Sequence, residues 1–229
     1  MTRVDEYKKS LRKKELTFVN IYIPEIEKLI TEFDSRNILI KIHKKEEVNR
    51  IIKFVRTSNA PITLLNKFYN LIKPDKKETE KNMSKLIEIG FEKERLGEQI
   101  GSLMCHAYQV TAERLKLHLI TTVDFSKLNL KNADSIPLGP IISSLKKQFK
   151  GNSFVDYLST KIRNPVAHYT YFFENGDLFL CEGYFDSSPN KITLAEFMIQ
   201  SKQFSMLTEL YFLSYLDKLV PSNELHLDQ

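Results

Sequence analysis

The spacing of apolar residues along this 229-residue chain predicts a mainly helical protein. Apolar side chains recur at intervals of three and four positions, as on one face of a helix, in residues 15–33, 45–57 and 61–72. Pro24 lies inside the first segment and indicates a kink or the start of its main helix. A longer helix is expected from about Leu86 to about Thr121, because its apolar residues form one continuous stripe.

Two glycines, Gly97 and Gly101, lie four positions apart in this long helix. Either they let another helix approach closely, or they only weaken their own helix by about 1 kcal/mol each. After a loop, short helices are expected to begin in PLGPIISSLKKQF and in SFVDYLSTKI. Ser153 is the expected N-cap of the second one, with Asp156 three residues on.

The period changes near residue 169. Two aromatic-rich runs flank Asn175-Gly176, a pair typical of a tight hairpin turn, so a β-hairpin is expected at about 169–183. Thr193 and Glu196 form a capping box, and 194–219 reads as a long amphipathic helix. The sequence therefore predicts an all-α fold, a helical bundle with one β-hairpin inserted before the last long helix.

The polar stretch KPDKKETEKN, residues 73–82, is the best candidate for a linker. It separates a basic helical N-terminal region of unclear role, 1–82, from a helical domain with the hairpin, 83–229. Of the net charge of +5, residues 1–93 carry +7 and residues 94–229 carry −2. A basic front half fits a polyanionic partner such as nucleic acid, and it fits a solvated lysine-rich surface equally well.

Composition excludes several classes of protein. No window holds 18 consecutive apolar residues, and the N-terminus has no apolar signal region, so neither a membrane span nor secretion is expected. Two distant cysteines, Cys105 and Cys181, suit a reducing cytoplasm and provide no disulfide framework. The five histidines never combine with cysteine at zinc-finger spacing, so no metal site and no cofactor are expected.

Arg163, Asn164 and His168 stand in an apolar and aromatic setting, KIRNPVAHYTYFF. Because the residue before a proline avoids helical geometry, the helix from 153 is expected to end near Arg163. Asn164 is then expected to cap a new turn with Pro165 at its first position. On this hypothesis His168 lies in an N-terminal turn, which disfavours an imidazolium ion and supplies a neutral base.

The segment IRNPVAHY, followed by a hairpin and a long helix, resembles proteins of the HEPN superfamily over roughly residues 86–219. Active members of that superfamily carry an arginine, a polar residue, three further residues and a histidine, which Arg163, Asn164 and His168 match. The resemblance implies a metal-independent endoribonuclease in which a 2′-hydroxyl attacks the neighbouring phosphate. His168 is then expected to move the proton, Arg163 to stabilise the phosphate, and Asn164 to orient one of them.

The same resemblance implies RNA as substrate, a homodimer with 153–168 at or near the interface, and a toxin–antitoxin or antiphage defence system. Some HEPN toxins have tyrosine two positions after the histidine, where a partner antitoxin nucleotidylates it. This chain has Thr170 there, which argues against such a partner. Glu113-Arg114 resembles the polar part of the superfamily's earlier core helix, and no role follows from it.

Alternatives to catalysis stay open. Many HEPN domains are inactive modules that bind RNA or protein, and an unrelated helical protein would use Arg163 and His168 only at a helix junction. Three lysines before the motif fit either an RNA-backbone contact or a solvated helix end: Lys146, Lys147 and Lys150. Four aromatic residues fit either base stacking or the hairpin core: Tyr169, Tyr171, Phe172 and Phe173.

Overall fold

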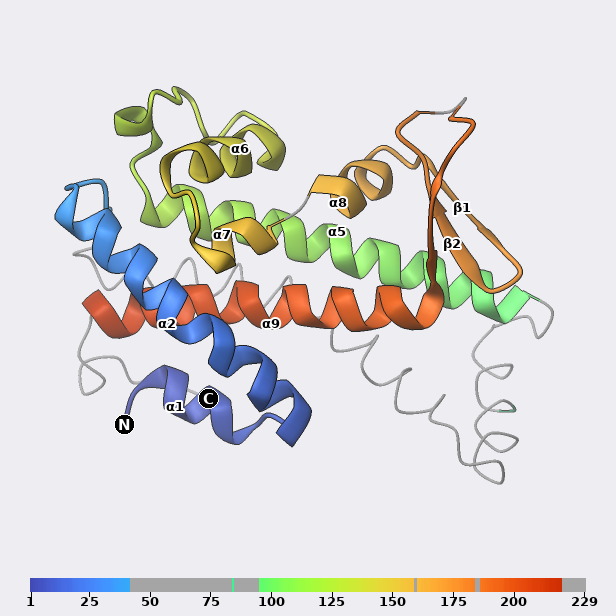
Figure 1. Ribbon diagram of the computed structural model, residues 1–229, viewed down its shortest axis with the longest axis horizontal. Helices are drawn as coiled ribbons and strands as arrows, with labels where there is room; N and C mark the ends of the chain where they lie inside the picture. The colour runs from blue at the N-terminus through green and yellow to red at the C-terminus, as the bar shows by residue number, and fades with distance from the viewer. Residues whose placement is uncertain (42–83, 85–94, 159, 184–185, 220–229) are drawn as a thin grey trace. The chain divides into compact units, whose positions relative to one another are not determined.

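A computed structural model describes residues 1–41, 84, 95–158, 160–183 and 186–219. Within these ranges the chain forms seven α-helices, one short 3₁₀ helix and one three-stranded antiparallel sheet (Figure 1). The mainly helical prediction is confirmed. None of the helices described is long and apolar enough to cross a membrane. The predicted helices at 45–57 and 61–72, the linker at 73–82 and the boundary after residue 82 lie outside the described residues.

The chain divides into two compact units. The first contains residues 1–51, 112–160 and 202–229, and the second contains 52–111 and 161–201. Two long helices contribute to both units, α5 (Leu96–Thr122) and α9 (Leu194–Leu219). The first unit also holds α1 (Arg3–Lys9), α2 (Lys13–Ser35), η2 (Phe125–Leu128), α6 (Leu138–Gln148) and α7 (Ser153–Tyr157).

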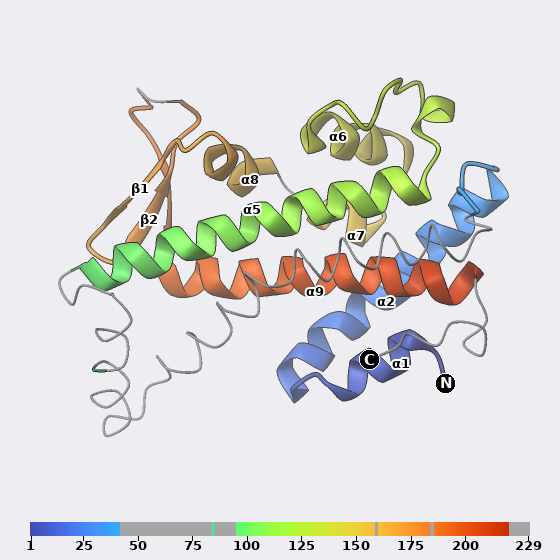
Figure 2. The same cartoon turned by 180° about the vertical axis from the view of Figure 1, so that it is seen from behind.

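Helix α2 confirms the helix predicted at 15–33 and continues through Pro24. Its buried residues follow the helical period: Val19, Ile23, Ile26, Leu29, Ile30 and Phe33. It crosses the C-terminal half of α9 in both views (Figures 1 and 2), and Lys202 of α9 forms an ion pair with Glu15. Burial of one apolar stripe, rather than propensity alone, therefore holds this helix in the unit.

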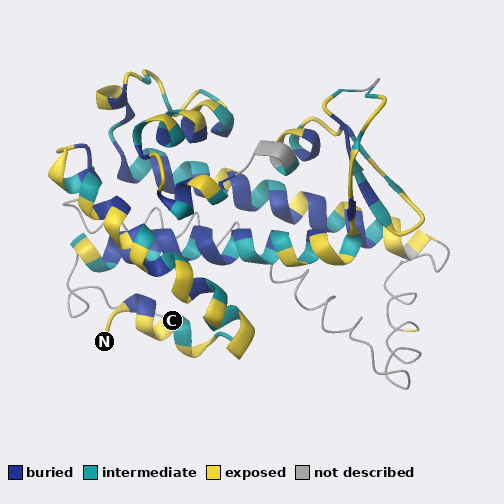
Figure 3. Ribbon diagram, in the orientation of Figure 1, coloured by how far each residue is buried: buried dark blue, intermediate teal, exposed yellow. Residues whose placement is uncertain are grey.

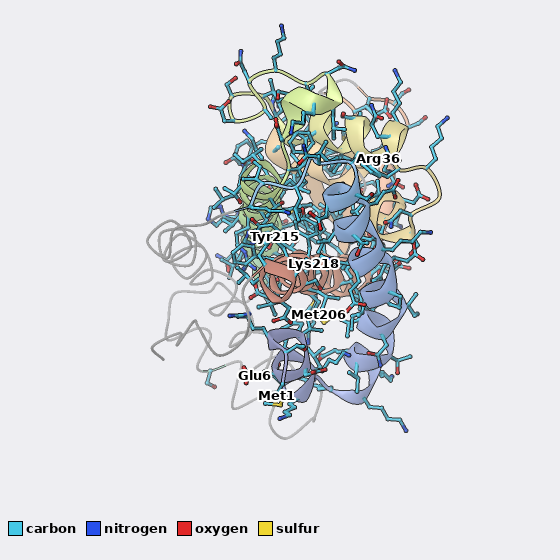
Figure 4. The ribbon with its side chains drawn as sticks, turned by 90° about the vertical axis from the view of Figure 1, so that its left-hand side faces the viewer. Met1, Glu6, Arg36, Met206, Tyr215 and Lys218 are labelled. Carbon is cyan, nitrogen blue, oxygen red and sulfur yellow. The ribbon has the colours of Figure 1, made fainter. Side chains whose placement is uncertain are left out.

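The C-terminal halves of α5 and α9 run side by side in the same direction (Figure 2). Arg114 of α5 pairs with Glu209, and the ring of His118 stacks on Phe212 with 4.2 Å between centroids. Tyr215, labelled in Figure 4, is fully buried, and its hydroxyl donates to the carbonyl of Ile40 over 2.6 Å. The core of the first unit thus includes several polar groups among its apolar residues.

The N-cap of α7 lies one residue earlier in the chain than the sequence predicted. The N-cap is Asn152 rather than Ser153: the Asn152 Oδ1 accepts from the Val155 N–H over 3.1 Å. The Asn152 amide nitrogen also donates to the carbonyl of Glu25 in α2 over 2.8 Å. One buried side chain therefore both caps α7 and joins it to α2, a tertiary role that capping preference alone does not specify.

The second unit contains the predicted hairpin, formed by β1 (Tyr171–Glu174) and β2 (Asp177–Leu180). Its two-residue turn has positive φ at Asn175 (52°) and at Gly176 (83°), as the tight primed turn requires. Leu178 and Leu180 of β2 are buried while the turn is exposed (Figure 3). The hairpin prediction is confirmed.

A third strand, β3 (Asn190–Thr193), was not predicted. It pairs antiparallel with β2, and Leu178 lies opposite Ile192. Only Ile192 of its four residues is buried, so the strand lacks the alternation that reveals longer strands. Directly after it, Thr193 and Glu196 form the predicted capping box, with the Thr193 N–H donating to the Glu196 carboxylate over 2.9 Å. Helix α9 has the predicted limits.

Gly101 of α5 receives the sheet rather than another helix. The Phe173 ring of β1 lies so close that a Cβ built on Gly101 would stand 2.2 Å from its Cε1 atom. Among the residues that the structure describes, a Cβ on Gly97 would meet nothing within 4 Å. Within those residues, Gly101 is therefore the glycine of the pair that has a packing function.

This difference gives a matched pair of variants. Gly101→Ala is expected to lower the free energy of unfolding by about 1–2 kcal/mol, because forcing the Phe173 ring aside costs more than the gain in helix propensity. Gly97→Ala is expected to raise it by up to about 1 kcal/mol. Denaturant unfolding curves measure both. Equal effects of the two substitutions, or no recovery when Phe173→Leu is added to Gly101→Ala, would contradict the packing function.

Candidate functional site

The motif lies on α8 (Thr160–Ala167), a helix that the sequence predicted differently. The chain leaves helical geometry at Leu158 (φ −64°, ψ 102°), and α8 then continues through Pro165. Asn164 therefore lies inside a helix rather than at its start, which corrects the expectation that a helix ends near Arg163. Pro165 and Val166 are buried, and their burial compensates for the hydrogen bond that a proline removes.

The end of α8 is a Schellman motif. Tyr169 has a left-handed backbone (φ 56°), the Thr170 N–H donates to the Pro165 carbonyl over 2.9 Å, and the Tyr169 N–H donates to the Val166 carbonyl over 3.4 Å. His168 is consequently the C-cap of α8 and does not lie in an N-terminal turn. The expectation of a neutral histidine rested on an N-terminal turn, so that reason is removed.

Asn164 and His168 occupy one side of α8. They are four positions apart, the His168 N–H donates to the Asn164 carbonyl over 3.0 Å, and both side chains are exposed. Arg163 precedes Asn164 in the same helix, and its side chain is outside the described part of the structure. Two of the three predicted catalytic side chains are therefore neighbours at an exposed helix end.

The aromatic residues after the motif divide into two groups. Tyr171 and Phe173 point to the inner face of the sheet, where burial raises the pKa of Tyr171 and the Phe173 ring covers Gly101. Tyr169 and Phe172 are 68% and 45% exposed. The hairpin-core alternative thus holds for Tyr171 and Phe173, and two exposed rings remain for other contacts.

The predicted RNA-contacting lysines belong to the first unit, whereas Asn164 and His168 belong to the second. The Lys146 ammonium donates to the carbonyl of Asp156 over 3.2 Å, which ties α6 to α7. Lys147 and Lys150 are exposed. Lys146 accordingly has a structural role, and the exposed pair fits a solvated helix end as well as a polyanion contact.

The burial of polar residues in α5 was not predicted from the sequence. His118 is 0% exposed, and neither of its ring nitrogens has a hydrogen-bond partner in the ranges the structure describes. Burial, followed by the nearby Arg114 charge, lowers the pKa of His118 to about 3. One signal was available in the sequence: His118 lies four residues after Arg114, and residues at that spacing share one face of a helix. Both side chains are buried. Glu113 is exposed, so only Arg114 of the pair noted in the sequence reaches the core.

A pocket of about 430 Å³ lies in the first unit among α1, α2 and α9. Asp217, which lines it, accepts from the backbone N–H groups of Arg3 and Val4 and from the Arg3 guanidinium. These contacts fasten α1 to α9, so the Asp217 carboxylate of this pocket serves the fold.

Asn164 and His168 thus form an exposed polar pair at the end of α8, and the exposed Tyr169 directly follows His168. Among the described residues, no three His, Cys, Asp or Glu side chains converge as metal ligands would. Comparisons of this chain with family models, with curated proteins and with solved structures found no match.

Proposed function

We propose that this chain is a metal-independent endoribonuclease of the HEPN type, with Arg163, Asn164 and His168 as its catalytic residues. The observation that carries the proposal is the exposed pair of Asn164 and His168 on one side of α8, directly after Arg163 in the chain. An imidazole can transfer a proton, a guanidinium can stabilise the charge on a phosphate, and an amide can orient either group.

The proposed reaction is a transesterification within RNA. The 2′-oxygen attacks the adjacent phosphorus and loses its proton to a base, while the bond from phosphorus to the 5′-oxygen breaks. The leaving 5′-oxygen takes up a proton, so the products are a 2′,3′-cyclic phosphate and a 5′-hydroxyl. Protons balance, and the step consumes no oxidant or reductant.

His168 is assigned the role of the acid that protonates the leaving 5′-oxygen, because imidazole is the side chain that most readily exchanges a proton near neutral pH. Arg163 neutralises the charge that develops on the phosphate, and Asn164 orients the phosphate or the imidazole. In a homodimer each copy contributes one His168, so that one imidazole accepts the proton of the 2′-hydroxyl while the other protonates the 5′-oxygen, which is the chemical reason for the proposed homodimer.

The proposed setting is a cytoplasmic toxin–antitoxin or antiphage defence system, in which an antitoxin or sensor protein controls the nuclease. The homodimer has its own test. A dimer in light scattering at micromolar concentration supports the shared site, and a monomer counts against it.

The direct test is RNA cleavage with all divalent metal removed. Purified protein is expected to cut single-stranded RNA in excess EDTA and to leave 2′,3′-cyclic phosphate or 3′-phosphate ends, because the nucleophile is the RNA's own 2′-hydroxyl. Mass spectrometry of the fragments identifies the ends. Cleavage that stops in EDTA, or fragments with 5′-phosphate ends, would contradict the mechanism.

A non-catalytic HEPN module that binds RNA or a protein partner is the second candidate. The exposed Tyr169 and Phe172 rings favour a binding surface. Binding of RNA without cleavage, by a chain whose expression is not toxic, would support this function instead.

A further inference from the structure

Tyr169 directly follows His168 and combines an unfavourable backbone with an unfavourable surface position. Its φ of 56° is left-handed, a conformation that glycine or asparagine usually adopts at the end of a helix. Its side chain is 68% exposed, although a large ring gains free energy by burial. The fold therefore keeps a tyrosine where stability alone favours a smaller residue, and such outliers are concentrated at functional sites.

The ring is also held in place. It stacks on Tyr171 with 6.5 Å between centroids and an angle of 28° between planes. Tyr171 is itself anchored at the inner face of the sheet, where its hydroxyl interacts with Ser102 and Cys105. One side of the Tyr169 ring is thus supported by an ordered neighbour, so its position is set before a ligand arrives.

We propose that Tyr169 stacks on a nucleobase of the RNA bound at Arg163, Asn164 and His168, which rests on the proposed function and names how the substrate is held. Every base has a π-face, so an aromatic platform next to a phosphate site binds single strands with little sequence preference. Tyr169 is a positioning residue, because it contacts the base and not the reacting phosphate.

The outer face of the sheet is a weaker candidate for the same role. Phe172 stacks on Phe179 there, with ring centroids 4.8 Å apart. On the same face the Lys191 ammonium is paired with the Asp177 carboxylate over 2.7 Å, and Glu174 adds another carboxylate. Carboxylates repel phosphates, so RNA is expected to use the Tyr169 ring.

Three variants separate stacking from a structural role. Tyr169→Phe keeps the ring, whereas Tyr169→Gly and Tyr169→Asn remove it and suit the left-handed backbone. With a fluorescent, 2′-O-methylated RNA that cannot be cut, affinity should fall about 5- to 150-fold for Gly and Asn and stay unchanged for Phe. For cleavage of unmodified RNA, KM should rise by a similar factor with kcat nearly unchanged, and the melting temperature should not fall.

A second measurement locates the contact. A series of RNAs carries one abasic nucleotide at successive positions. At one of these positions the missing base should weaken binding to the wild type, because the stacked base is then absent. The same RNA should bind Tyr169→Gly no more weakly than the intact RNA does.

Other outcomes overturn the proposal in distinguishable ways. If the wild type cuts RNA and Tyr169→Gly cuts it with the same KM, the stacking role is wrong and the nuclease stands. If the wild type neither binds nor cuts RNA, both are wrong. If Tyr169→Gly splits a dimer without changing RNA affinity, the ring belongs to a protein contact and the stacking role is again wrong.

Discussion

Replacing His168 with alanine is expected to slow RNA cleavage by about 10²- to 10⁴-fold, because the leaving 5′-oxygen loses its proton donor. His168 is exposed at the C-cap of α8, so the free energy of unfolding should change by less than about 1 kcal/mol. Single-turnover cleavage assays measure the rate, and circular dichroism checks the fold. Toxicity on expression that His168→Ala relieves is a faster first indication.

Three further variants sharpen this test. His106 is an exposed histidine on α5 in the same unit, so His106→Ala should leave the rate unchanged. Arg163→Ala should cost about as much as His168→Ala, because the phosphate charge is then unmatched. Asn164→Ala should reduce the rate less than either, because Asn164 only orients the phosphate or the imidazole. Loss of folding in His168→Ala together with an unaffected rate per folded molecule would favour the binding module.

The free energy of unfolding is expected to fall by about 2 kcal/mol between pH 7 and pH 5 on account of His118 alone. Its pKa is about 3 in the fold, against 6.5 for an unperturbed histidine. Below pH 6.5 the unfolded chain therefore binds a proton that the buried ring does not, and stability decreases as the pH falls toward 3. Above pH 6.5 both states hold a neutral ring, and the effect disappears.

Denaturant unfolding at pH 7, 6 and 5 measures this slope, and His118→Leu is the control. The substitution removes two buried nitrogens without partners in the described ranges, so stability at pH 7 should be unchanged or higher. Between pH 7 and pH 5 the free energy of unfolding of this variant should fall by about 2 kcal/mol less than that of the wild type. Equal slopes in the two proteins would show that His118 titrates normally and is not sealed in the core.

Several elements follow from local sequence signals. The helical period of 15–33 predicted α2, and the capping box at Thr193 and Glu196 predicted the start of α9. Asn175-Gly176 predicted the hairpin, because its turn needs two residues with positive φ. Each of these signals acts within a few residues, so it operates whatever the rest of the chain does.

The burial of polar groups could not be read from the same signals. Arg114 and His118 interrupt the apolar stripe of α5, yet both are buried, since Glu209 and Phe212 of α9 lie against them. Likewise, four aromatics within the five residues 169–173 separate into exposed and inward rings only when the sheet packs on α5 at Gly101.

The sequence by itself determined the helical class, the hairpin and the three motif residues, because periodicity, turn geometry and residue chemistry are local properties. Only the tertiary structure decided where His168 lies. Pro165 favoured a helix break, but Thr170 is held by Cys181 through two hydrogen bonds of 2.9 Å, and this anchors the chain as it leaves α8. With Thr170 fixed and Pro165 and Val166 buried, the helix ends in a Schellman motif, which makes His168 its C-cap.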